Sequence, residues 1–115
     1  MKRAFGVLAV ALALTGCGDP AEAWLQDGFM GDVSQDKWNG ATPVQQVGTA
    51  GIWLKRIQAD DLLVFKVPVA ELKPKATELT QCINELVAKG GAVNKEAYQQ
   101  GIVCINMLGW SKGKE

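Results

Sequence analysis

The side chains that could do chemistry in this chain are few, and none of them is a histidine. Histidine is the commonest general base and the commonest metal ligand, so the usual hydrolase and metal-site designs lack their central group. The serines, Ser34 and Ser111, therefore have no imidazole to activate them. Asp60 and Asp61 are adjacent, which points their carboxylates to different faces and favours a helix terminus over a catalytic pair. We predict from these residues that the protein is not an enzyme and has no metal site and no cofactor.

The composition is that of one small globular domain. The chain has 115 residues, of which 48% are hydrophobic, and its 12 basic side chains balance its 12 acidic ones. No basic patch attracts nucleic acid, so we expect no nucleic-acid partner. This leaves binding or structural roles as the function classes to weigh.

The N-terminus has the pattern of a secretory signal peptide. Lys2 and Arg3 form a short basic start, and an apolar run follows at residues 4–14. A helix of that length rises about 16 Å, which is too short for a hydrocarbon core of about 30 Å. A basic start before a short apolar run is typical of a segment that directs export and is then removed.

The apolar run ends in a motif with more specific chemistry. Leu14-Thr15-Gly16-Cys17 resembles the lipobox of bacterial lipoprotein precursors, and the resemblance covers residues 1 to about 19. It implies cleavage before Cys17, a diacylglyceryl thioether on the Cys17 sulfur and usually a third acyl chain on its amine, which together anchor a protein stably to a membrane. It also implies a periplasm-facing protein of the bacterial cell envelope. Gly18, in place of the aspartate that favours inner-membrane retention in this family, favours the outer membrane.

The other two cysteines are expected to form a disulfide. With Cys17 occupied by lipid, Cys82 and Cys104 remain as an even pair in a compartment that oxidises thiols. The alternative is a two-cysteine metal site, which would need two carboxylates as further ligands. Loss of Lys2 and Arg3 on cleavage leaves ten basic against 12 acidic side chains, so the mature part is slightly acidic.

Glycine, proline and aromatic positions divide the chain into four parts. Aromatic residues are unusual in a solvated linker, so part of the region after Cys17 is expected to dock onto the domain, with a short helix near residues 21–26. The predicted parts are a lipoprotein signal peptide (1–16), a lipidated tether and docking segment (17–41), a small helical domain (42–110) and a polar tail (111–115).

The domain is predicted to be mainly α. Thr42 and Pro43 are suited to start a helix that ends near Asp60, and Gly48 and Gly51 lie on one face of it, where they would admit a close neighbour.

A second helical pattern continues to Lys89, and Asn94 is suited to cap the helix after it. Cys82 and Cys104 lie about 12 and 15 Å of helix rise from the turn between these two helices, so they come level if the helices are antiparallel. We therefore expect a disulfide-pinned helical hairpin over about residues 70–109.

Residues 62–67 are the one strand-like run. They are rich in β-forming residues and end at Pro68. Without a second convincing strand, three alternatives stay open: an extended connector lying on the core, a continuation of helix, or an edge that pairs with a partner chain.

Tryptophan is the remaining candidate for recognition. Tryptophan side chains anchor protein interfaces and line ligand grooves, but they also fill the cores of small domains, so both roles stay open. The candidate partner or ligand contacts are Trp24, Trp38, Trp53 and Trp110.

These features favour a lipid-anchored envelope protein that acts as a protein-interaction module. The mature part loosely resembles small plasmid entry-exclusion lipoproteins, which are short and helical and carry a cysteine pair, although this chain and its cysteine spacing are longer. The resemblance implies docking on or occlusion of another envelope protein; immunity or inhibitor proteins and secretion-system accessories share the same build. The alternative is a periplasmic lipoprotein that binds a small molecule or an envelope polymer in a tryptophan-lined groove.

Overall fold

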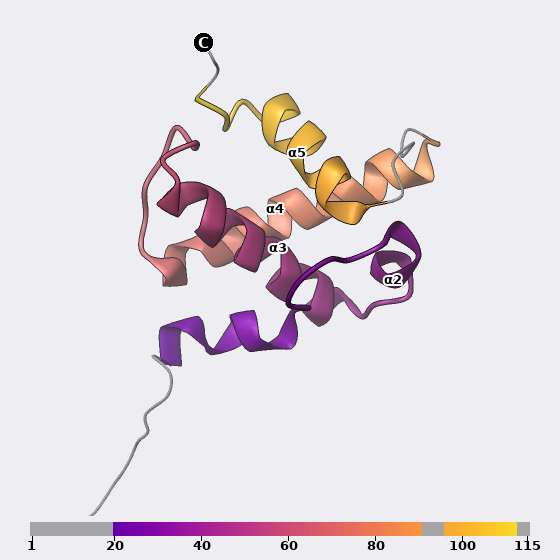
Figure 1. Ribbon diagram of the computed structural model, residues 1–115, viewed down its shortest axis with the longest axis horizontal. Coiled ribbons are helices and arrows are strands. Elements are labelled where there is room, and N and C mark those ends of the chain that lie inside the picture. The colour runs from indigo at the N-terminus through magenta and orange to yellow at the C-terminus, as the bar shows by residue number, and fades with distance from the viewer. Residues whose placement is uncertain (1–19, 91–95, 113–115) are drawn as a thin grey trace, which may run out of the picture.

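The fold is mainly α, as the sequence predicts. The computed structural model describes residues 20–90 and 96–112, and Figure 1 shows their arrangement. Within these residues there is no sheet, only two isolated antiparallel bridges. The elements are a 3-10 helix η1 (Pro20–Asp27) and the α-helices α2 (Gln35–Asn39), α3 (Pro43–Ala59), α4 (Val69–Ala88) and α5 (Ala97–Met107).

Helix α3 begins and ends where its sequence predicts. The Thr42 hydroxyl accepts a hydrogen bond from the Gln45 backbone N–H, and the Gln45 side chain accepts one from the Thr42 N–H. This capping box and Pro43 in the first turn satisfy or remove donors that a helix start leaves free. The C-cap is Asp60, so the predicted role of Asp60 at a helix terminus is confirmed.

Helices α4 and α5 form the predicted hairpin. They run in opposite directions in Figure 1, and the Cys82–Cys104 disulfide joins them with a Cα–Cα distance of 6.0 Å. Helix α5 has Glu96 at its N-cap position. The predicted cap, Asn94, lies outside the described residues.

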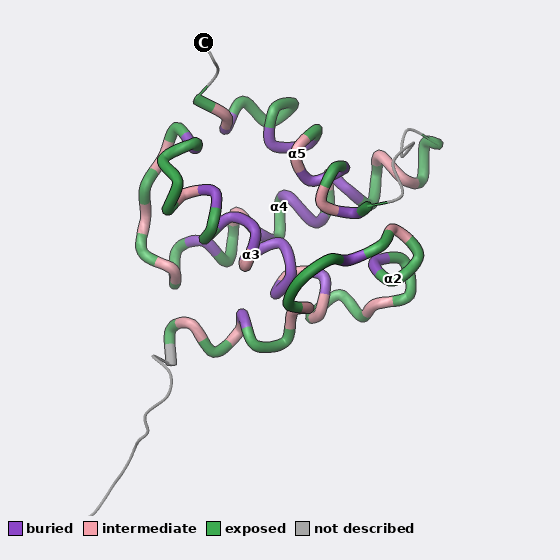
Figure 2. Tube along the Cα trace, in the orientation of Figure 1, coloured by how far each residue is buried: buried purple, intermediate pink, exposed green. Residues whose placement is uncertain are grey.

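The core lies where α3, α4 and α5 face one another, as the buried stretches in Figure 2 show. Helix α4 turns one apolar stripe inward, with its members three or four residues apart, which matches the predicted periodicity. The fully buried members of this stripe are Leu72, Ala76, Leu79 and Ile83.

The close neighbour expected at Gly48 and Gly51 is η1. A Cβ atom on Gly48 would lie 2.6 Å from the backbone nitrogen of Gly28, and one on Gly51 would overlap the Trp24 ring. Only glycine therefore lets η1 pack backbone to backbone on α3. Together these glycines fix the position of Trp24.

Two residues in the second half of the 17–41 segment belong to the core. Val33 and Trp38 are almost completely buried, and the Val33 carbonyl accepts a hydrogen bond from the Ala97 N–H at 2.9 Å. Val33 and Trp38 thus pack against the helices of the domain, as expected for a docking segment. Residues 17–19 lie outside the described residues.

Residues 62–67 are extended and follow the edge of the molecule at the left of Figure 1. Leu63 forms an antiparallel bridge with Ser111, so the start of the predicted polar tail pairs with this segment. At the other end, the Gln58 side-chain amide exchanges two 2.9 Å hydrogen bonds with the Val67 backbone. The segment is therefore an extended connector held at both ends.

Candidate functional site

Three of the four tryptophans are core residues. Trp38 is 0% exposed, Trp53 is 7% exposed and Trp110 is 8% exposed. The Trp38 and Trp53 rings stack with centroids 5.5 Å apart, and Tyr98 meets Trp53 edge-on at the same distance. The burial of most of each side chain matches the core role that the sequence leaves open for them. The periodicity of the sequence does not distinguish a core tryptophan from a surface tryptophan at Trp38, because its helix α2 has only five residues.

Trp38 also organises a ring of hydrogen bonds between three helices. Its indole N–H donates to Asn84 Oδ1 on α4 at 2.9 Å, and the Asn84 amide donates to Gln46 Oε1 on α3 at 3.1 Å. Gln46 closes the ring by donating to the Trp38 carbonyl at 2.8 Å. Trp38 is therefore buried without an unpaired polar group in this hydrogen-bond network, because its indole N–H and its carbonyl both have partners.

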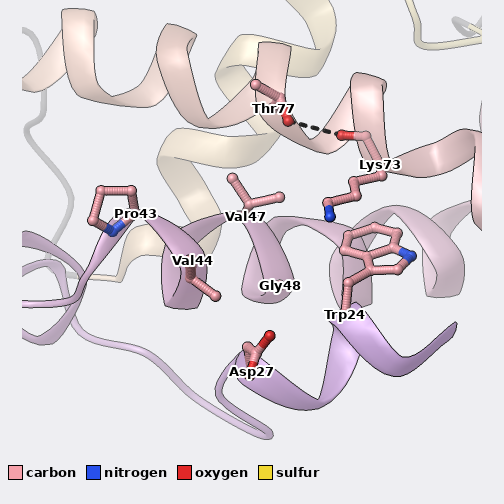
Figure 3. Close-up of a pocket in the computed structure, with 8 residues that line it drawn as sticks. All are labelled: Trp24, Asp27, Pro43, Val44, Val47, Gly48, Lys73 and Thr77. Atoms are coloured by element: carbon pink, nitrogen blue, oxygen red, sulfur yellow. Dashed lines mark hydrogen bonds between the residues drawn. The ribbon is translucent and has the colours of Figure 1, made fainter.

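Trp24 is the tryptophan that the core leaves partly exposed. It forms one wall of a pocket of about 200 Å³ between η1, α3 and α4, which Figure 3 shows in close-up. Pro43, Val44 and Val47 give the pocket an aliphatic surface on α3. The Trp24 indole nitrogen is buried and has no hydrogen-bond partner within residues 20–90 and 96–112.

Two opposite charges flank this pocket. Lys73 extends from α4 toward the Trp24 ring, and Asp27 points toward α3 from the end of η1 (Figure 3). Neither side chain takes part in an ion pair within the described residues. The Thr77 hydroxyl, also in the lining, donates to the Lys73 carbonyl at 2.9 Å. The pocket is thus a small amphipathic site with a positive and a negative wall.

A second hollow, of about 420 Å³, lies between α3 and the start of α5. Ile52, Trp53 and Tyr98 supply apolar and aromatic surface, while Arg56 and Glu96 supply opposite charges. Its volume falls within the usual range for small-molecule sites, which is about 300–1,000 Å³.

The connector at 62–67 forms an edge of the molecule with exposed apolar side chains. Val64 donates to the Trp110 carbonyl at 2.8 Å, and Lys112 donates to the Leu62 carbonyl at 3.0 Å. Leu63, between these two bonds, is buried with 2% exposed, and Val64 lies at a bend of the chain. The Leu62 and Val64 side chains on either side of Leu63 are 55% and 56% exposed.

Two contacts hold this edge in place. The Phe65 and Trp110 rings meet edge-on with centroids 5.5 Å apart. The Lys112 ammonium donates to Asp61 Oδ1 at 2.8 Å, and this hydrogen bond and its charge hold the pKa of the Asp61 carboxyl below its ordinary value. A fixed edge loses little conformational entropy when a partner binds to it.

Within the described residues, no three metal-ligating side chains gather in one place. None of the described helices is both long enough and apolar enough to cross a membrane.

Comparison with known proteins gives no relative. No protein-family model, curated protein or solved structure matches the chain.

Proposed function

We propose that this protein is a lipid-anchored component of the bacterial cell envelope that binds another envelope protein. Anchoring rests on Leu14-Thr15-Gly16-Cys17 and the basic and apolar residues before it. The Cys82–Cys104 disulfide supports an oxidising compartment such as the periplasm.

The exposed apolar side chains on the connector are the observation that carries partner binding. Leu62 and Val64 are 55% and 56% exposed, and they lie two residues apart beside the buried Leu63. Apolar side chains left in water on a held segment favour contact with an apolar surface of another protein. We therefore propose that an apolar segment of the partner docks on Leu62 and Val64. A lipid anchor would raise the local concentration of the two proteins and favour such docking.

A charged side chain on the edge tests this docking. A lysine ammonium opposes contact with an apolar surface, and Val64 is exposed enough to accept it without loss of fold. In intact cells, we expect Val64→Lys to reduce recovery of the crosslinked partner at least tenfold, measured by affinity purification and mass spectrometry. Val103→Lys is the matched control, because Val103 is an exposed valine on α5.

The outcomes of this experiment separate clearly. A tenfold lower recovery of the crosslinked partner with Val64→Lys, and less than a twofold change in recovery with Val103→Lys, would support docking at the edge. Equal recovery from the two variants would contradict it, and so would a crosslinked product that contains only copies of this chain.

A second candidate function has one observation in its favour. The hollow beside Trp53 is large enough for a small molecule and combines aromatic surface with Arg56 and Glu96. This supports the alternative of a small-molecule or envelope-polymer binding lipoprotein, although Trp53 is the only tryptophan in the lining of that hollow within the described residues.

A further inference from the structure

We propose that the Trp24 pocket binds the headgroup of a zwitterionic phospholipid, one that carries a phosphate and a primary ammonium, in the membrane that holds the anchor. This inference rests on the proposed lipid modification of Cys17. It goes beyond anchoring because it assigns a second, non-covalent membrane contact to the folded domain and fixes which face meets the lipid.

The pocket is within reach of the membrane surface. Pro20 is the third residue after Cys17, and a fully extended chain covers at most about 11 Å over those three steps. Four residues of 3-10 helix add about 8 Å between Pro20 and Trp24. Trp24 therefore lies within about 20 Å of the lipidated residue, whatever the conformation of the residues between. A lipidated Cys17 thus leaves the η1 face of the domain within reach of the headgroups.

The apolar surface of the pocket is suited to that depth. Tryptophan is enriched at membrane interfaces because its ring is apolar while its N–H is polar. Trp24 is the partly exposed tryptophan of the described residues, and Val44, 59% exposed, lies across the pocket from it. Together they offer the glycerol and upper acyl region an apolar contact on the anchored face.

The charges of the pocket match a zwitterion. The Lys73 ammonium would pair with the lipid phosphate, and the Asp27 carboxylate on the opposite wall would pair with the lipid ammonium (Figure 3). Neither side chain has an ion-pair partner within the described residues, so no ion pair has to break when the lipid binds. An anionic lipid without an ammonium would satisfy Lys73 and leave Asp27 close to a negative group.

Fluorescence quenching tests the site in the lipidated, full-length protein. We would reconstitute the protein in vesicles that contain phosphatidylethanolamine with brominated acyl chains. Bromine quenches nearby indoles, and the other three tryptophans are core residues. We expect Trp24→Phe to remove most of the quenching and Lys73→Gln to reduce it at least twofold. Lys89→Gln is the control, because Lys89 is exposed on the same helix about 24 Å further along.

Three results would overturn the site: quenching that survives Trp24→Phe, equal quenching in the two lysine variants, or equal quenching by brominated phosphatidylglycerol. The intact mass of the same preparation reports the lipid on Cys17 separately. If Cys17 carries no lipid, the proposed anchoring fails, and the site is tested by titrating the full chain with glycerophosphoethanolamine. A shift of the Trp24 indole N–H resonance that inorganic phosphate does not produce supports the site, and no shift overturns it.

Discussion

Replacing Trp38 with alanine is expected to lower the free energy of unfolding by roughly 3–5 kcal/mol, the usual cost of removing a large aromatic side chain from a core. Trp38 is 0% exposed, so the substitution leaves a cavity beside Trp53 that neighbours fill only partly. It also removes the indole donor and leaves Asn84 Oδ1 to water. Urea unfolding followed by circular dichroism measures the loss.

Trp38→Phe separates packing from hydrogen bonding. Phenylalanine keeps an aromatic ring against Trp53 but lacks the N–H that bonds Asn84, so we expect a loss of about 1–2 kcal/mol, well below the alanine value. Asn84→Ala removes the same bond from the other side. An alanine variant of Trp38 as stable as the wild type would contradict the placement of this residue in the core.

Removal of the disulfide is the second large effect. The double variant Cys82→Ala/Cys104→Ala is expected to lose about 3 kcal/mol, because the bond closes a loop with a sequence separation of 22 and restricts the unfolded chain. Alanine is chosen because Cys104 is 0% exposed and a serine hydroxyl would be buried there. Thermal unfolding with and without reductant measures the change.

The double variant also supplies the control for the reductant. Reduction should lower the midpoint of thermal unfolding of the wild-type protein toward that of the variant. The midpoint of the variant should stay unchanged. Equal midpoints for oxidised and reduced wild-type protein would contradict a stabilising bond between α4 and α5. The hairpin would then be held by apolar packing alone.

The elements that sequence predicts well are those whose signals are local. The capping box at Thr42, the apolar stripe of α4 and the level positions of Cys82 and Cys104 each depend on neighbours within one helix or one hairpin. The glycine pair at Gly48 and Gly51 predicts a close neighbour for the same reason, although it does not identify η1 as that neighbour.

Features that depend on residues far apart in the sequence could not be predicted from local patterns. The edge at Leu63 forms because three residues near the C-terminus pair with it, and no periodic pattern marks so short a partner. The Trp24 pocket combines residues from η1, α3 and α4, so no single helix shows it. The burial of Trp38 depends on hydrogen bonds to Gln46 and Asn84, which lie on other helices.

The intact mass of the mature protein, purified from the membranes of its host, tests the proposed anchoring most directly. We predict a chain that begins at Cys17 and carries the mass of a diacylglyceryl group, with a further acyl chain on its amine. Substitution of Cys17 by serine should abolish the modification and release the protein from the membrane fraction. A mature protein that begins elsewhere, or one whose Cys17 is unmodified, would contradict the lipid anchor and the membrane contact inferred from it.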